Sequence, residues 1–145
     1  MEWLRDALKI ICDAALTHDV RFALEPINRY ETSLINTVPQ GLELIDAVGY
    51  DNFGLLLDTF HMNIEETNME ESIRICGDRI FHFHVADSNR WYPGGGHLDF
   101  ESILKALLTT NYKGFVSGEF LAIPDGEIAA EKNINFLNHI LKSIN

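Results

Sequence analysis

The sequence predicts an α/β domain in which parallel strands alternate with helices, and three observations support this fold class. Short apolar segments alternate with longer segments whose apolar residues recur every three or four positions, as in amphipathic helices. This strand–helix unit repeats every ~30 residues, the length of a βαβ unit. Apolar residues make up 46% of the 145-residue chain, a share that suits a packed core. We therefore expect parallel strands joined by right-handed crossovers.

The first helix and the first strand–helix unit have clear boundaries in the sequence. Residues 2–18 are expected to be helical, because apolar residues lie at helical spacing between charged ones. The first strand, 20–28, is expected to end at Pro26, since proline has no N–H to donate to a sheet. A helix at 38–49 follows. Its boundaries are marked by Thr37 as a possible N-cap, Pro39 in the first turn and Gly49 as the stop.

Three more units follow, which gives four strand–helix repeats in all. Their strands and helices are expected at 52–61 with 68–77, at 79–87 with 99–111, and at 114–121 with 126–144. Gly77 closes the helix before it, and Asp99 is placed to cap the helix after it. No linker divides the chain, so residues 1–145 are expected to form a single domain. The chain opens on a helix without a preceding strand, as if a larger fold began earlier.

Charge and cysteine content narrow the range of partners. The net charge is −11, from 22 acidic and 11 basic residues, and such a field repels both nucleic-acid phosphates and anionic lipid. Neither nucleic acid nor a membrane is therefore an expected partner.

Cys12 and Cys76 lack metal-site spacing and are expected to be buried free thiols of a reducing cytosol. Without a signal-like apolar run, the chain is expected to be soluble and cytoplasmic.

A polar residue that can bind a metal lies at or near the end of each expected strand. These residues are Glu25, Asp58, His84 and Glu119. The carboxyl ends of parallel strands meet at one edge of a sheet, where ligands bind. Burying each unpaired charge there costs several kcal/mol, and a shared cation offsets that cost. Three carboxylates and one imidazole suit Mn²⁺ or Mg²⁺, with Co²⁺ or Zn²⁺ as alternatives.

His82 precedes His84 by two residues, so both side chains are expected on the same face of the strand. The sequence favours His82 as a core residue or a hydrogen-bonded neighbour, one layer deeper than the metal ligand.

Four segments together resemble a known family. They are LEPINRYET (24–32), LLDTFHMNIEE (56–66), FHFHVADSNRWYPGGGHLDF (81–100) and NYKGFVSGEF (111–120). They resemble the C-terminal half of the xylose-isomerase-like TIM barrels, in the sugar phosphate isomerase/epimerase superfamily. The nearest branch is the D-tagatose 3-epimerase type of ketose 3-epimerase. The resemblance covers residues 1–145 and implies that the chain forms half of a TIM barrel.

The resemblance implies a function and a role for each site residue. The metal ligands fall on Glu25, Asp58, His84 and Glu119, and the acid/base pair is Glu25 with Glu119. Contacts with substrate oxygens fall on His61 and Arg90, and Glu31 lies near the substrate. The implied activity is that of a divalent-metal-dependent sugar epimerase or isomerase. It moves a proton at C3 of a ketose through an enediolate.

Several alternatives stay open at this stage. The chain could be a non-catalytic metal-binding half-barrel, or a related inosose dehydratase or hydroxypyruvate isomerase. An incomplete barrel leaves two sheet edges open, so we expect a fragment or truncated form, with a homodimer completing the barrel as another possibility. Simpler roles also exist for single residues. Asp58 could cap a helix, His61 could cap the strand end, and Arg90 could pair with Asp87.

Overall fold

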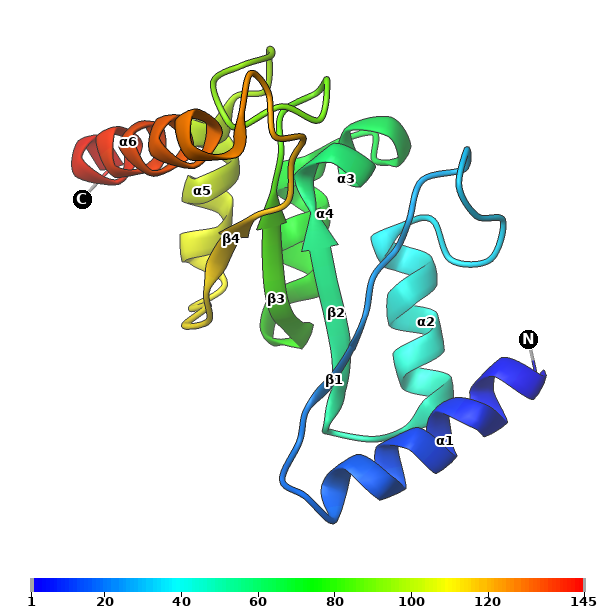
Figure 1. Cartoon of the computed structure of the whole chain (residues 1–145). Coiled ribbons are helices and arrows are strands. Elements are labelled where there is room, and N and C mark those ends of the chain that lie inside the picture. The colour runs from blue at the N-terminus through cyan, green and yellow to red at the C-terminus, as the bar shows by residue number, and fades with distance from the viewer. Residues whose placement is uncertain (1, 145) are drawn as a thin grey trace.

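The computed structural model describes residues 2–144. Within these residues, a single sheet contains four parallel strands in the order β1-β2-β3-β4 (Figure 1). The strands are β1 (Phe22–Leu24), β2 (Phe53–Asp58), β3 (Ile80–Val85) and β4 (Val116–Gly118). Each strand pairs with the next one along the chain, as successive βα units of a barrel do. The predicted α/β class with parallel strands is therefore confirmed.

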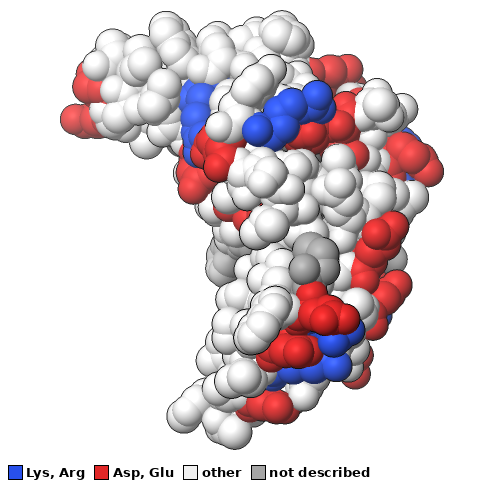
Figure 2. All heavy atoms as spheres, turned by 90° about the vertical axis from the view of Figure 1, so that its right-hand side faces the viewer, with Lys and Arg blue, Asp and Glu red and all other residues white. Residues whose placement is uncertain are grey.

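The helices lie mainly on one face of this sheet. The longer ones are α1 (Glu2–Leu16), α2 (Val38–Val48), α4 (Met69–Cys76), α5 (Phe100–Thr109) and α6 (Gly126–Ile144). Helices α2, α4 and α5 pack behind the strands, and the face of the sheet toward the viewer carries no helix of the described residues (Figure 1). Figure 2 shows a concave outline on the side of that uncovered face. The apolar core therefore fills the space between the sheet and the helix layer.

The capping residues predicted from the sequence set the helix boundaries. The Thr37 hydroxyl accepts a hydrogen bond from the Gln40 N–H in a capping box, and Gly49 ends the same helix with a left-handed φ of 76°. The Asp99 carboxylate accepts from the N–H groups of Glu101 and Ser102 at the start of α5. These local signals fix the helices that support the carboxyl edge of the sheet.

One element differs from the sequence prediction. Residues 52–61 were expected to form a strand, but β2 ends at Asp58 and a short helix, α3 (Thr59–Glu65), begins immediately. The cause is local, because the Asp58 side chain caps this helix by accepting from the N–H groups of Phe60 (2.7 Å) and His61 (3.3 Å). The strand prediction for 59–61 was therefore wrong, and His61 lies on a helix. The outer strands are also shorter than expected, with β1 at Phe22–Leu24 and β4 at Val116–Gly118.

Both cysteines are buried free thiols, as predicted. Burial raises the pKa of the Cys76 thiol to about 12, which keeps it protonated and unreactive. Among the residues from 2 to 144, no helix combines the length and apolar character needed to cross a membrane.

Candidate metal centre

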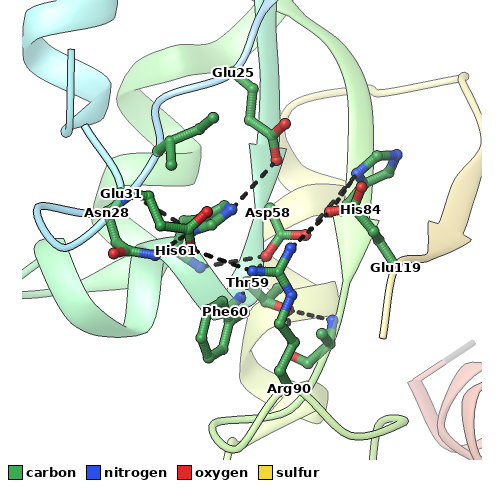
Figure 3. Close-up of polar contacts among 12 residues, drawn as sticks. Glu25, Asn28, Glu31, Asp58, Thr59, Phe60, His61, His84, Arg90 and Glu119 are labelled. Atoms are coloured by element: carbon green, nitrogen blue, oxygen red, sulfur yellow. Dashed lines mark hydrogen bonds and ion pairs between the residues drawn. The ribbon is translucent and has the colours of Figure 1, made fainter. Parts of the chain in front are cut away.

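Four side chains with potential metal-ligand atoms converge at the carboxyl edge of the sheet. Glu25 follows β1, Asp58 ends β2, His84 lies in β3 and Glu119 follows β4. One ligand-type atom from each residue lies within 4.8 Å of the others (Figure 3). Asp58 and His84 are partners in the register of β2 and β3, which places their side chains together on the same face. The parallel sheet thus brings together all four residues expected from their strand-end positions.

The hydrogen bonding of this cluster is incomplete in a specific way. Among residues 2–144, five buried side-chain atoms lack a hydrogen-bond partner, and three of them are Glu25 Oε1, Asp58 Oδ2 and His84 Nδ1. His84 Nδ1 lies 3.5 Å from Glu119 Oε2 and 3.9 Å from Asp58 Oδ2, without a hydrogen bond to either. Buried polar atoms are almost always satisfied in folded proteins. These three atoms therefore fit the ligands of a divalent cation.

The electrostatics of the cluster agree with this fit. Burial, followed by the negative charges of Asp58 and Glu119, raises the pKa of Glu25 to about 7. Burial also raises the pKa of Asp58 above its ordinary value. A cation at this position would favour the ionised form of both carboxylates, because it places the opposite charge beside them. Three carboxylates and one imidazole form a donor set for a hard or borderline divalent ion.

Asp58 uses its two oxygens differently. Oδ1 accepts the two backbone N–H groups that start α3, whereas Oδ2 faces the cluster without a hydrogen-bond partner. The helix-capping alternative and the ligand prediction for Asp58 are therefore compatible. One oxygen holds the local backbone while the other stays available.

A second group of predicted residues borders the cluster. Arg90 Nη1 lies 3.3 Å from Glu31 Oε1, and Arg90 Nη2 lies 3.6 Å from Glu119 Oε2. His61 Nε2 lies 3.8 Å from Glu25 Oε1 (Figure 3). The three residues predicted to contact a substrate therefore lie together beside the four ligand-type side chains.

Arg90 does not pair with Asp87, which had been its simpler alternative. The guanidinium instead pairs with Glu31 and Glu119 and lies over the ring of Phe60, 4.8 Å from its centroid. The backbone of Arg90 adopts a left-handed φ of 60°. This unusual conformation is held at both ends, because its N–H donates to the Asp87 carbonyl and its carbonyl accepts from the Leu121 N–H, both at 2.8 Å.

Asp87 organises the loop that carries Arg90, a role that sequence reasoning missed. Its carboxylate accepts hydrogen bonds from the N–H groups of Ser88, Gly94 and Leu98. Burial alone would raise the pKa of Asp87, but these backbone donors hold it below its usual range. The signal available in the sequence was an aspartate directly before a turn-rich, glycine-rich loop.

Asn28 is a second residue that sequence reasoning missed. It is fully buried between Glu31 and His61, and its side-chain nitrogen lies 2.8 Å from an atom of each. The only signal in the sequence was an asparagine between Glu25 and Glu31. A sequence does not show whether such a residue is buried.

His82 matches the expectation of a hydrogen-bonded neighbour. Its Nε2 lies 2.7 Å from Ser117 Oγ, and its ring lies 4.8 Å from the ring of His84 in an edge-to-face arrangement. His84 contributes to the cluster of ligand-type atoms and His82 does not. The pair therefore consists of one candidate ligand and one residue that packs beside it.

Comparison with known proteins agrees with the fold. Residues 1–140 match the family model described as xylose isomerase-like TIM barrel. The chain belongs to the xylose isomerase-like TIM barrel family. This confirms the family resemblance that four sequence segments had indicated.

The curated relatives within this family include ketose 3-epimerases. The chain is 39% identical over 126 residues to a probable ketose 3-epimerase of Synechocystis sp., covering 87% of this chain and 44% of that protein. It is 42% identical over 113 residues to the D-psicose 3-epimerase of Enterocloster bolteae, covering 78% of this chain and 38% of that enzyme. The chain thus spans less than half the length of these two relatives.

Solved structures of family members show the same partial match. An L-ribulose 3-epimerase structure superimposes with a TM-score of 0.91 and 32% identity, covering 96% of this chain and 53% of the other. The D-allulose 3-epimerase of Methylomonas sp. in complex with D-allulose gives a TM-score of 0.78 and 39% identity, covering 81% and 41%. The four βα units described above therefore correspond to part of a TIM-barrel epimerase.

Proposed function

We propose that this chain supplies the metal centre and the acid/base pair of a divalent-metal-dependent ketose 3-epimerase. The observation that carries the proposal is the cluster of Glu25, Asp58, His84 and Glu119, whose ligand-type atoms lie within 4.8 Å of one another. These four residues would hold the cation, with Mn²⁺ as the first choice and Mg²⁺, Co²⁺ or Zn²⁺ as alternatives. A bound divalent ion would polarise the C2 carbonyl of a ketose and so acidify its C3–H bond.

Glu25 and Glu119 are the proposed acid/base pair. They follow β1 and β4, the first and last strands of the row, so a planar sugar intermediate between them would meet one carboxylate on each face. One carboxylate removes the C3 proton and the other returns a proton to the opposite face, which inverts C3. Burial raises the pKa of Glu25 to about 7 in the metal-free chain, and a bound cation would restore the ionised form that a base requires.

Arg90 and His61 are the proposed contacts with the substrate oxygens. Arg90 brings positive charge to within 3.6 Å of Glu119 Oε2, and Glu31 balances that charge on the other side. A fixed donor near the developing oxyanion stabilises it without reorganisation during the reaction. The net charge of −11 supports a neutral sugar over a polyanion as the substrate.

We further propose that residues 1–145 form a partial, C-terminal half-barrel domain of the epimerase fold. Because the chain covers 44% and 38% of two relatives, a non-catalytic metal-binding half-barrel is the second candidate function. A homodimer that completes the barrel is a third possibility, because β1 and β4 both lie at edges of the described sheet.

One set of measurements on the purified chain separates these possibilities. Metal content, mass in solution and solvent-deuterium exchange at C3 of a panel of ketoses are measured on the same preparation. We expect one bound divalent ion per site and exchange at C3. A chain that binds no divalent ion would overturn the site assignment. Metal binding without exchange would support the non-catalytic half-barrel, and a doubled mass would support the homodimer.

The acid/base role is tested by Glu119→Gln, which keeps the shape of the side chain but removes the base. We expect exchange at C3 to fall by about 10²–10⁴-fold, the usual contribution of a general acid or base. The matched control is Glu131→Gln, the same change at an exposed position of α6. Retained exchange in the Glu119 variant would remove this residue from the acid/base pair.

A further inference from the structure

We infer that Asn28 holds His61 in the tautomer that carries its proton on Nε2, so that the ring presents a hydrogen-bond donor to the candidate site. The inference rests on the proposed function for the use of that donor, but the tautomer itself can be measured without turnover. The side chains of both residues are buried, with 1% of Asn28 and 2% of His61 exposed. Water therefore has little access to the contact between them.

Two donors of Asn28 converge on one nitrogen of the His61 ring. The side-chain Nδ2 lies 2.8 Å from His61 Nδ1, and the backbone N–H of Asn28 points at the same nitrogen from 3.4 Å. A backbone N–H can only donate. Its partner Nδ1 must therefore be the acceptor in that contact.

The orientation of the Asn28 amide follows from two neighbours whose roles are fixed. The Tyr30 N–H can only donate, and it contacts Asn28 Oδ1 at 3.0 Å. The Glu31 carboxylate accepts, and its Oε1 lies 2.8 Å from Asn28 Nδ2. Arg90 Nη1 donates to the same Glu31 oxygen at 3.3 Å, so this oxygen acts as an acceptor. The amide nitrogen is thereby directed toward both Glu31 and His61, and it donates to each.

The proton of the neutral His61 ring is consequently on Nε2. That nitrogen lies 3.8 Å from Glu25 Oε1, on the side of the ring that faces the candidate metal centre (Figure 3). The opposite tautomer would place an Nδ1–H against two N–H donors and turn a lone pair toward a carboxylate. Both contacts would be repulsive, so the buried amide selects the tautomer. An Nε2–H donor suits a hydroxyl or carbonyl oxygen of a ketose, on which negative charge develops.

Asn28 is therefore a positioning residue, because it acts through His61 and does not itself reach the cluster. It also connects Arg90 with His61 through Glu31. Glu31 accepts from both Asn28 and Arg90, so one buried amide links the guanidinium to the imidazole.

The test is the tautomer of His61, measured by long-range ¹H–¹⁵N correlation spectra of the metal-free chain. A His61→Gln variant identifies the His61 signals among the 6 histidines. We expect the wild type to show the Nε2–H tautomer. In Asn28→Asp, a carboxylate oxygen replaces the donor that faces Nδ1, so we expect the proton to move to Nδ1. A wild-type Nδ1–H tautomer, or a tautomer unchanged by Asn28→Asp, would overturn the inference.

The matched control is Asn68→Asp, the same chemical change at the N-cap of α4. Asn68 caps that helix through Oδ1, which aspartate retains, so the His61 spectrum should not change. Asn28→Ala is a second variant in case the aspartate disrupts folding. It leaves only the 3.4 Å backbone contact to Nδ1, so the Nδ1–H form should become detectable, and an unchanged spectrum would count against the inference.

The tautomer and the exchange at C3 are separate measurements, so failure of the proposed function can be distinguished from failure of the inference about Asn28. A wild-type chain that has the Nε2–H tautomer but no C3 exchange keeps the inference about Asn28 and removes the epimerase proposal. In a preparation active in exchange, Asn28→Asp should lower kcat by about 10²-fold, since the donor to the substrate oxygen is lost.

Discussion

Asp58 ends β2 and Asp87 follows β3, and both are almost equally buried, with 1% and 0% of each residue exposed, yet their surroundings are opposite. The Asp87 carboxylate accepts backbone N–H groups through both oxygens, and its pKa is lowered despite its burial. Asp58 leaves Oδ2 without a hydrogen-bond partner, and burial raises its pKa. A buried carboxylate that is fully bonded serves the fold, whereas one with an unpaired oxygen is available for a ligand.

The same comparison separates the loop after β3 from the candidate metal centre. The loop is closed around Asp87 by hydrogen bonds within the chain and needs no external group. In the centre, three buried side-chain atoms lack a hydrogen-bond partner. The loop nevertheless serves the centre, because it fixes the backbone of Arg90, whose guanidinium lies beside Glu119.

The largest expected effect on stability is that of Asp87→Ala. Removing the acceptor of several backbone N–H groups should lower the free energy of unfolding by about 2–4 kcal/mol, measured by urea denaturation. Asp87→Asn retains one acceptor oxygen and should lose less. If Asp87→Ala were as stable as the wild type, the loop would not depend on this carboxylate.

Addition of Mn²⁺ should stabilise variants of Asp58 and Asp87 by clearly different amounts. At a concentration one hundred times Kd, a bound ion raises the free energy of unfolding by about 2.7 kcal/mol. We expect this increment in the wild type and in Asp87→Asn, but not in Asp58→Asn, which loses a proposed ligand oxygen while keeping the helix cap through Oδ1. Urea denaturation with Mn²⁺ and with a chelator measures both values. Equal increments in the two variants would refute the distinction between these carboxylates.

Stability should also depend on pH through Glu25 in the metal-free chain. Its pKa is raised from 4.5 to about 7, so the folded chain binds more protons than the unfolded chain between these values. The stability contributed by protonated Glu25 is present below pH 4.5 and is lost as the pH rises through about 7. Glu25→Gln should therefore be more stable than the wild type at pH 8, by about 2–3 kcal/mol.

Two further comparisons of the wild type with Glu25→Gln test this prediction. The wild type and Glu25→Gln should have similar stability near pH 4, where both side chains are neutral. Saturating Mn²⁺ should reverse their order at pH 8, because the ion favours the carboxylate over the amide. If the wild type remained less stable with Mn²⁺, Glu25 would not be a ligand.

The convergence of Glu25, Asp58, His84 and Glu119 could be predicted because it follows from one rule of parallel sheets. Strand ends meet at the same edge, so a polar residue at each end is enough. The helix boundaries at Thr37, Gly49 and Asp99 could also be predicted, because the signals lie in the residues next to each boundary, and these predictions were confirmed.

What the sequence did not reveal depends on contacts made in three dimensions. The apolar segment that contains Thr59 and Phe60 reads as a strand, and only the backbone bonds to Asp58 show that a helix begins there. Asp87 and Asn28 resemble ordinary loop residues until their burial is known. Polar residues that organise a loop or orient a neighbour carry no periodic pattern, so periodicity cannot identify them.

The smallest effect on the free energy of unfolding is expected at His82 and His84. These neighbours again differ in that one ring nitrogen is hydrogen-bonded and the other is not. His82 Nε2 bonds to Ser117 Oγ at 2.7 Å, whereas His84 Nδ1 lacks a hydrogen-bond partner. Ser117→Ala should therefore lower the free energy of unfolding by about 0.5–1.5 kcal/mol and leave the Mn²⁺ increment unchanged. His84→Gln should lose most of that increment, because it removes a proposed ligand. A loss of the Mn²⁺ increment in Ser117→Ala would show that His82 supports the metal ligands directly.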